Sequence, residues 1–330
     1  MKRIGLICPG RGSYTERTLG SLPADHAWVQ RADELRSSYE LEPLSALDAA
    51  ASFDRARHLK AANAAPLIWL VAMIDAAAAL ERGKPVCIAG NSMGWYIALA
   101  VGGALDFDDG FRLAQEMALL QEEAGGGGQL LYPRVDERWR PDAERERAVE
   151  EALAAAGGEA FRSIELGGYA VLAGTDDGIR ALLSSLPKVE LGRNTYPFRL
   201  FGHGPYHTPL LRGVAERARA QLGGLGWRRP RITLIDGRGV RFTPWSADVE
   251  ALRDYTLGAQ VMTPYDFTQS VRVALREYAP DELVLPGPGN TLGGVCGQIL
   301  VRERWRGVAD KADFEALQAA ETPLIHSMGR

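Results

Sequence analysis

The pentapeptide Gly90-Asn91-Ser92-Met93-Gly94 limits the possible folds of this chain more than any other stretch of its 330 residues. A short apolar run, residues 86–89, precedes it, and an apolar stretch long enough for a helix, residues 95–101, follows it. A strand, a sharp turn with a serine, and a helix make up the G-x-S-x-G nucleophile elbow. The small residues let neighbouring backbone pass close by, and the turn aims the Ser92 side chain into solvent. We therefore expect Ser92 to be a nucleophile in an α/β protein.

The backbone amide of Met93 adds a second feature to this turn. It would stand at the N-terminus of the following helix, where N–H groups lack intrahelical acceptors and the helix dipole favours negative charge. An oxyanion formed on Ser92 would find a hydrogen-bond donor there. The same glycines also occur where a strand merely packs against a helix, so the partners of Ser92 decide between a catalytic and a structural turn.

The bulk composition excludes several classes of protein. A hydrophobic content of 46%, a charged content of 24% and a net charge of −4 are ordinary for a globular protein and give no bulk attraction to nucleic acid. The longest apolar stretch, residues 64–80, is interrupted by Pro66 and Asp75, so we expect no membrane span. The N-terminus has too few apolar residues for a signal peptide, which favours a cytoplasmic location. The three cysteines have apolar neighbours and no metal-ligand spacing, so we expect buried thiols and no metal site (Cys8, Cys87 and Cys296).

Hydrophobic patterns divide the chain into a large domain and an insert. A run of glycines, residues 125–128, breaks the chain after a helical pattern. Beyond it, residues 129–199 follow the order β-α-β-β-α-β, which is that of a ferredoxin-like plait. The last of its strands is either 189–191 or 197–200, and the polar chain beyond residue 308 is expected to be peripheral.

The sequence thus predicts an α/β fold with two domains. The larger is α/β-hydrolase-like, with a mostly parallel central sheet, and comprises residues 1–127 and 200–330. The smaller is ferredoxin-like and comprises residues 128–199. We expect the functional site in the cleft between them.

A serine hydroxyl needs a base to become a nucleophile, so a histidine must lie near Ser92. His58 belongs to a charged helical stretch that is typical of a surface, and His26 and His326 have no other chemistry around them. His203 and His207 remain, in a segment whose glycines and prolines fix the path of the chain. Either of the two could instead make a structural hydrogen bond. No single acidic residue stands out as a third member, and a backbone carbonyl could orient the imidazole instead.

Four segments follow one another in the order found in malonyl-CoA:acyl-carrier-protein transacylases and the acyltransferase domains of polyketide synthases. The chain resembles this family at a P-G-Q-G-S-like loop, at a G-H-S-x-G-like elbow, at the segment with the catalytic histidine, and at a C-terminal G-P-G turn (residues 8–13, 90–94, 205–210 and 285–289). The predicted insert also lies where the family carries one. The four segments are spread across nearly the whole chain, from residue 8 to residue 289.

The resemblance implies a ping-pong acyl transfer. Ser92 would attack an acyl-CoA thioester with His207 as general base, because the P-x-H-x-P-L pattern aligns on His207 and not on His203. The thiol of a phosphopantetheine arm on an acyl carrier protein would then take the acyl group. The family's oxyanion hole maps to the backbone amides of Met93 and Arg11, and the carbonyl that holds the histidine maps to Gln260. Coenzyme A and phosphopantetheine would be substrates, with no permanently bound cofactor, and arginines at the cleft mouth would dock the acidic carrier.

The departures from the family pattern concern the acyl group. Malonyl enzymes of the family carry an arginine in the helix after the elbow, whose fork grips the free carboxylate. The aligned residue here is Met117, and leaving that carboxylate unpaired would cost several kcal/mol. We therefore expect a neutral, non-malonyl acyl group in a pocket formed by Met117, Trp95 and Asn91. Arg11 replaces a glutamine and could grip a carboxylate from another direction.

Two other functions remain open on the same scaffold. The first is an editing hydrolase, which would release acyl groups from carrier proteins with water as the acceptor. The second is a catalytically silent docking subunit of a polyketide or fatty acid synthase. The presence of both Ser92 and His207 argues against the silent subunit, because it would need neither.

Overall fold

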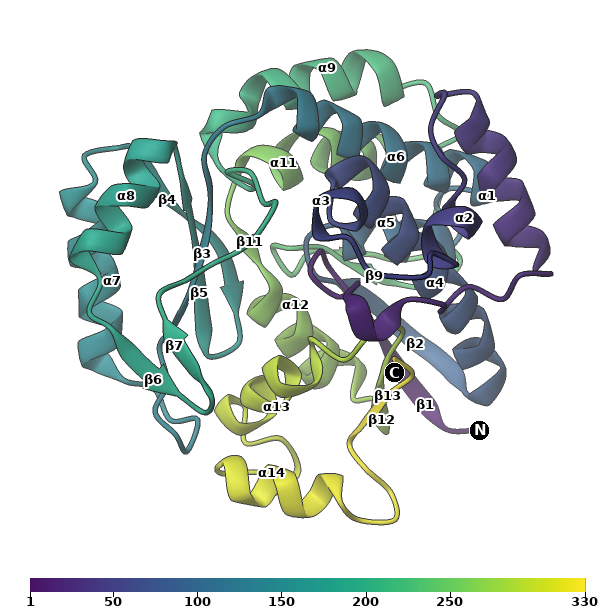
Figure 1. The fold of residues 1–330 in the computed structure, drawn as a ribbon. Helices are drawn as coiled ribbons and strands as arrows, with labels where there is room; N and C mark the ends of the chain where they lie inside the picture. The colour runs from purple at the N-terminus through teal and green to yellow at the C-terminus, as the bar shows by residue number, and fades with distance from the viewer. Residues whose placement is uncertain (330) are drawn as a thin grey trace.

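The chain folds into two units, each built on its own sheet (Figure 1). The structure is a computed structural model and describes residues 1–329. The large unit holds a six-stranded sheet of order β10-β9-β2-β1-β12-β13. The small unit holds a five-stranded sheet of order β11-β4-β5-β3-β8, and a separate two-stranded hairpin is formed by β6 and β7.

The central sheet of the large unit is parallel except at one edge. Every neighbouring pair runs parallel apart from β9 and β10, which are antiparallel. Its strands are β1 (Arg3–Cys8), β2 (Lys84–Gly90), β9 (Leu234–Ile235), β10 (Arg241–Phe242), β12 (Glu282–Leu285) and β13 (Ile325–Ser327). A central parallel strand covered on both faces reads as an unbroken apolar run, as β1 and β12 do. The predicted α/β class with a mostly parallel central sheet is confirmed.

Helices cover both faces of this sheet. Ile4 and Leu6 of β1 face one hydrophobic cluster, and Ile7 faces the other. The first cluster includes α4 (Ala61–Arg82), α5 (Gly94–Val101), α6 (Phe107–Ala124) and α9 (Arg212–Leu222). The second includes α12 (Phe267–Val273), α13 (Gly293–Arg302) and α14 (Lys311–Gln318). The shorter helices are α1 (Ala27–Ser37), α2 (Leu44–Asp48), α3 (Arg55–His58), α10 (Val249–Asp254) and α11 (Gln260–Met262).

Helix α4 is long and apolar enough, by length and composition, to cross a membrane. In the structure most of it is buried, and it packs against α5, α6 and the sheet. Its apolar character is therefore accounted for by its place in the core of the large unit.

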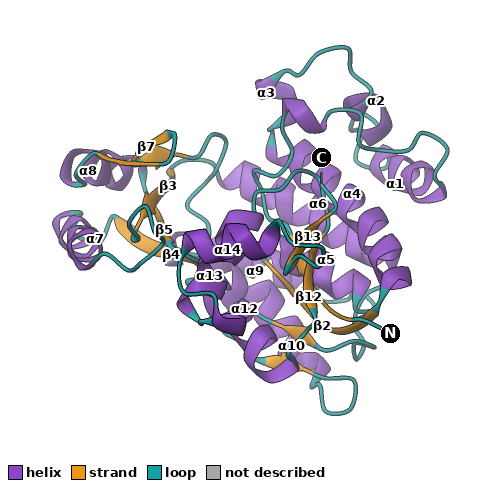
Figure 2. Ribbon diagram, turned by 90° about the horizontal axis from the view of Figure 1, so that it is seen from below, coloured by secondary structure: helices purple, strands orange, loops and turns teal. Residues whose placement is uncertain are grey.

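The small unit has the strand order of a ferredoxin-like plait. Its antiparallel strands lie in the order β4-β5-β3-β8, and α7 (Ala143–Ala155) and α8 (Asp176–Ser185) cover the face turned away from the large unit (Figures 1 and 2). The strands are β3 (Gly128–Pro133), β4 (Ala160–Leu166), β5 (Tyr169–Gly174) and β8 (Phe198–Arg199). The last strand is thus the second of the two predicted candidates. Residues 189–191 form β6 (Val189–Leu191), which pairs with β7 (Asn194–Tyr196).

One strand of the small sheet comes from the large unit. β11 (Tyr265–Asp266) pairs in parallel with β4, with Tyr265 opposite Ile164. The sheet is therefore not contained within residues 128–199, the predicted extent of the small domain. Two residues of a distant segment tie the small sheet to the large unit.

Two local expectations were wrong. His58 is fully buried, with Nε2 at 3.0 Å from the Leu47 carbonyl and its ring stacked on Phe53, so it is no surface residue. The chain beyond residue 308 is not peripheral throughout, because β13 completes one edge of the central sheet by pairing with β12. The expected reduced, buried cysteines are confirmed: Cys8, Cys87 and Cys296 are free and fully buried.

Candidate active site

Ser92 lies on a sharp turn between β2 and α5. Its φ of +55° falls in the left-handed region, which is unfavourable for a residue with a side chain. A Cβ on Gly90 would lie 2.2 Å from the backbone of Gly94, and one on Gly94 would lie 2.4 Å from the Cys8 carbonyl oxygen. Only glycine fits at these two positions, so the sequence G-x-S-x-G has a steric cause here.

Ser92 and His207 form a hydrogen-bonded pair. Ser92 Oγ lies 2.7 Å from His207 Nε2, and His207 Nδ1 lies 2.6 Å from the carbonyl oxygen of Gln260. A carbonyl only accepts, so Nδ1 carries the proton and Nε2 presents its lone pair to the Ser92 hydroxyl. The fold thus brings together three residues that lie far apart in the sequence.

Burial sets the charge of His207. The imidazole is 3% exposed, and burial lowers the pKa of His207 to about 4, partly opposed by its hydrogen bond to the Gln260 carbonyl. The ring is therefore neutral near pH 7, which is the form that can take a proton.

Two tyrosines and the Gln260 side chain hold the elbow in place. Gln260 Nε2 donates to the Ser92 carbonyl at 3.2 Å, and Tyr96 donates to Gln260 Oε1 at 3.0 Å. The Tyr265 hydroxyl donates to the Gly90 carbonyl at 2.7 Å, and its ring lies 5.3 Å from that of His207. Sequence reasoning missed both tyrosines, although Tyr96 follows Ser92 by four residues and Tyr265 follows Gln260 by five.

The two predicted oxyanion donors border one small cavity. Arg11 and Met93 line it together with Ser92 and His207. Met93 precedes the first residue of α5, where helical amides lack partners. Gln121, near the C-terminal end of α6, lines the same cavity and was not singled out from the sequence.

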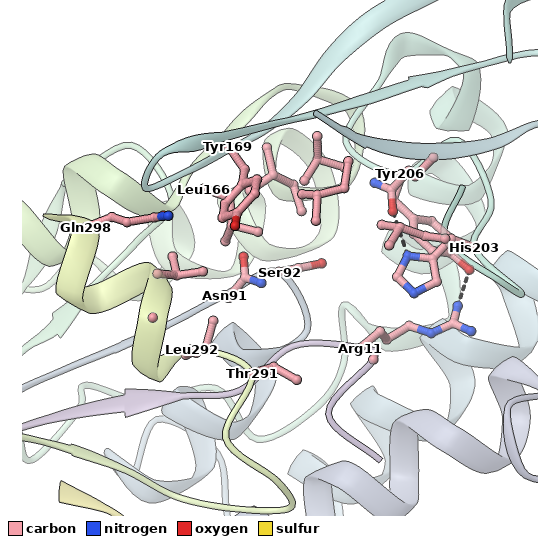
Figure 3. A pocket seen from close by; sticks show the side chains of 18 of the residues that line it. Arg11, Asn91, Ser92, Leu166, Tyr169, His203, Tyr206, Thr291, Leu292 and Gln298 are labelled. Carbon is pink, nitrogen blue, oxygen red and sulfur yellow. Dashed lines mark hydrogen bonds between the residues drawn. The ribbon is translucent and has the colours of Figure 1, made fainter. Parts of the chain in front are cut away.

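A larger cavity of about 360 Å³ opens beside Ser92 (Figure 3). It lies between the small sheet and α13, and its lining is mostly aliphatic and aromatic. The aliphatic walls come from β3, β4 and β5 on one side and from α13 with the segment before it on the other (Leu131, Ile164, Leu166, Val171, Leu292 and Val295). Asn91, Tyr169 and Gln298 contribute polar groups to the lining.

Trp95 and Met117 do not lie in the predicted acyl pocket. Trp95 is fully buried, with Nε1 donating to Thr256 Oγ1 at 2.9 Å and its ring edge-on to Tyr255. Met117 is 1% exposed and belongs to the core of the large unit. Neither residue lines a cavity beside Ser92, since α5 and α6 turn these positions into the core. Asn91, the third predicted pocket residue, does line the larger cavity.

Arg11 is the only lysine, arginine, aspartate or glutamate among the described residues that line the larger cavity. Its guanidinium donates to the Tyr206 hydroxyl, to the Gly202 carbonyl at 2.9 Å and to the Leu59 carbonyl at 3.4 Å. All three of these hydrogen-bond partners of Arg11 are uncharged.

Known proteins that this chain resembles include malonyl transacylases. No family model matches the chain. It is 24% identical over 311 residues to the malonyl CoA-acyl carrier protein transacylase of Salmonella typhimurium, covering 91% of this chain and 94% of that protein. The Bacillus subtilis protein of the same name is 24% identical over 325 residues, with 96% of each chain covered.

Solved structures agree with these sequence matches. The malonyl-CoA:ACP transacylase of Synechocystis sp. PCC 6803 superposes with a TM-score of 0.76 at 17% identity, over 100% of this chain and 98% of that one. A malonyl-transacylase in complex with its type II polyketide synthase acyl-carrier protein superposes with a TM-score of 0.74 at 20% identity, over 99% and 96%. By sequence and by fold, the chain is similar to malonyl-CoA:acyl-carrier-protein transacylases over more than 90% of its length.

Proposed function

We propose that this chain is an acyltransferase that acylates an acyl carrier protein through an ester on Ser92. The observation that carries the proposal is the hydrogen-bonded series from Ser92 through His207 to the Gln260 carbonyl, placed at the mouth of an apolar cavity. Similarity to transacylases over more than 90% of the chain supports the same reaction class.

The first half-reaction uses the coenzyme A thioester. Ser92 Oγ attacks the thioester carbonyl while its proton passes to His207 Nε2. The negative charge on the carbonyl oxygen is met by the backbone amides of Met93 and Arg11. The C–S bond then breaks, and His207 returns its proton to the departing sulfur, which leaves free coenzyme A and an acyl-serine ester.

The second half-reaction runs the same steps in reverse order with a new thiol. The thiol of the carrier's phosphopantetheine arm gives its proton to His207 Nε2, and its sulfur attacks the ester carbonyl. The C–O bond to Ser92 breaks, and the proton on His207 goes back to Ser92 Oγ. The products are the acylated carrier protein, with its acyl group in a thioester on the phosphopantetheine arm, and the original enzyme, so no other reactant is needed.

The cavity beside Ser92 favours a neutral acyl group. Its walls are aliphatic on both sides, and Met117, aligned with the carboxylate-binding arginine of malonyl enzymes, is an uncharged core residue. A carboxylate placed among the aliphatic side chains, away from Arg11, would lose its hydration without gaining an ion pair, which costs several kcal/mol. An alkyl chain placed there would gain about 0.8 kcal/mol for each buried methylene group.

Malonyl transfer is the second candidate, and Arg11 is the observation that favours it. Its guanidinium has no carboxylate partner among residues 1–329, although three of its hydrogen bonds already go to neutral oxygens. The relatives described above are malonyl enzymes by name. An editing hydrolase would use the same serine and histidine, with water in place of the second thiol.

The test is intact-protein mass spectrometry after brief incubation with matched thioesters. The panel holds malonyl, acetyl and octanoyl groups on coenzyme A and on a carrier protein, with Ser92→Ala as control. We expect an octanoyl adduct that Ser92→Ala lacks and that added carrier protein removes as octanoyl carrier. A malonyl adduct formed faster than the neutral ones would assign the chain to malonyl transfer. Decay of the adduct to free acid at the same rate with and without carrier would assign it to hydrolysis.

A further inference from the structure

A second histidine lies beside the catalytic pair without touching it. His203 lines the larger cavity together with Ser92, and it also lines two outer cavities that flank the segment around Phe201. His203 therefore stands where the larger cavity beside Ser92 meets two outer cavities. One of these is also lined by Gln121 and Glu122, and the other by Tyr14 and Phe53. The reaction proposed above gives His203 no role.

Three hydrogen bonds determine which nitrogen of His203 carries the proton. The Ser163 hydroxyl donates to the Tyr206 carbonyl at 2.8 Å, which is an acceptor only. Ser163 Oγ must therefore accept from the amide nitrogen of Gln129, at 2.6 Å. This places Gln129 Oε1 against His203 Nδ1 at 2.7 Å, so Nδ1 is the donor. The remaining ring nitrogen, Nε2, keeps its lone pair.

The series is buried, so its direction is fixed. Gln129 is 1% exposed and Ser163 is fully buried. The pairing of β4 with β5 shifts register between Arg162 and Ile164, a bulge that lets the Ser163 side chain turn toward the site. Reversing the series would leave a buried polar group without a partner. Burial and the nearby Arg11 hold the pKa of His203 well below its usual value, so the ring stays neutral.

Nothing in the described chain occupies His203 Nε2. Its one hydrogen bond among the described residues is the contact from Nδ1 to Gln129, and its ring is tilted against that of Tyr206, with 5.8 Å between centroids. Figure 3 shows the other ring nitrogen of His203 on the side of Arg11. The fold thus prepares a neutral hydrogen-bond acceptor at the junction of the cavities.

We propose that His203 Nε2 accepts a hydrogen bond from an amide N–H of the pantetheine arm of both thioester substrates. The inference rests on the proposed function. An arm that reaches Ser92 through either outer cavity passes this junction, and it carries two amide N–H groups that lose water on entry. A buried N–H without a partner is costly, so an acceptor on the path speeds acylation. In this role His203 is a positioning residue, distinct from His207.

The test changes the enzyme and the substrate together. Octanoyl thioesters are made on pantetheine and on two analogues, each with one amide N–H replaced by an ester oxygen. Ser92 acylation is timed by intact-protein mass spectrometry for the wild type, His203→Phe and His203→Gln. We expect one analogue to react about three- to tenfold more slowly than pantetheine on the wild type and equally fast on His203→Phe, with His203→Gln in between. The same ratio in wild type and His203→Phe would overturn the proposal.

Nitrogen NMR gives a second readout, which uses only the wild-type protein and so does not depend on whether a variant folds. The ¹⁵N shift of His203 Nε2 should report an unprotonated nitrogen and should move when pantetheine is added, but not with the analogue that lacks the N–H whose loss slows the wild type. A protonated Nε2, or no movement with pantetheine, would contradict the assignment. If His203→Phe slowed only the step with the second thiol, with no coupling to the amides, His203 would be a base for that thiol and the proposal would be wrong. Failure of every thioester to acylate wild-type Ser92 would instead refute the proposed function.

Discussion

His207 is oriented by a backbone carbonyl, and this choice affects its acidity. A carboxylate at Nδ1 would favour the protonated imidazole strongly, whereas a neutral carbonyl favours it only weakly. Burial therefore dominates, and the pKa of His207 falls to about 4. The base is unprotonated over the whole physiological range, so its availability does not limit the reaction near pH 7.

This leads to a pH profile that separates His207 from an ordinary histidine. Because a lowered pKa keeps the imidazole neutral as the pH falls, the acylation rate should be flat from pH 8 to about pH 5.5 and should decline only toward pH 4. A free histidine would give a decline near pH 6.5. Stopped-time mass spectrometry of Ser92 acylation measures the profile, with circular dichroism at each pH to exclude unfolding. A midpoint of the rate profile near pH 6.5 in folded protein would show that burial does not favour the neutral imidazole of His207.

At the scale of elements, the strand–turn–helix elbow was predictable from the sequence. Which faces of α5 and α6 meet the core was not. Strand, turn and helix are neighbours in sequence, and the two glycines have a local steric cause. Trp95 and Met117 were placed in the pocket by comparison with the family pattern, and an aligned position does not say which face of a helix meets the core. The core on this side of the sheet contains both residues, while Gln121, one helical turn beyond Met117, reaches the site. The distinction depends on packing between elements that are distant in the chain.

The elbow glycine gives a prediction about stability. In Gly94→Ala the new Cβ would lie 2.4 Å from the Cys8 carbonyl, so β1 and α5 must separate. We expect a loss of about 1–3 kcal/mol or more in the free energy of unfolding. The matched control is Gly213→Ala in α9, where nothing lies within 4 Å of the new Cβ. This control should gain about 0.5–1 kcal/mol. Urea unfolding measures both, and equal midpoints for the two variants would contradict the steric argument.

The wall of α13 gives a prediction about chain length. Val295 lines the larger cavity opposite the small sheet, so Val295→Phe should fill part of the 360 Å³. The value of kcat/KM for octanoyl thioesters should fall about tenfold or more, while that for acetyl thioesters stays within about threefold. Val301→Ala, on the same helix and buried away from the cavity lining, controls for general loosening of α13. An unchanged octanoyl-to-acetyl ratio in Val295→Phe would show that the acyl chain lies elsewhere.

At the scale of the whole molecule, sequence reasoning recovered the two-sheet architecture but not the connections between the sheets. The strand order of the small unit follows from a local β-α-β-β-α-β pattern. The pairing of β11 with β4 joins residues about 100 positions apart through two residue pairs, too short a strand to leave a pattern. β13 was missed for the same reason, since a three-residue strand in a polar tail has no periodicity. The contact between His207 and Gln260 came from family resemblance alone.

The double role of Tyr265 gives a prediction at this scale. Its hydroxyl is the donor to the Gly90 carbonyl, so Tyr265→Phe leaves a buried carbonyl without that partner. We expect a loss of about 1–3 kcal/mol in the free energy of unfolding and a lower acylation rate, because the elbow loses one of its supports. Tyr132→Phe, whose hydroxyl bonds the Pro187 carbonyl within the small unit, should destabilise without slowing acylation of the folded protein. Equal effects of both variants on the acylation rate would show that the Tyr265 hydroxyl does not support the elbow.

The two anchors of Tyr265 also bear on how a substrate gets in. Its backbone belongs to the small sheet, and its hydroxyl holds the strand that ends at the nucleophile. A hinge motion that moved the small unit away from the large one would have to break the β11–β4 pairing or displace the elbow, because Tyr265 is bound to both. Such a hinge would misalign the serine each time it opened. Substrate entry and product release should therefore depend on side-chain rearrangements and on passage of the narrow pantetheine arm, while the two units keep their relative positions throughout the cycle.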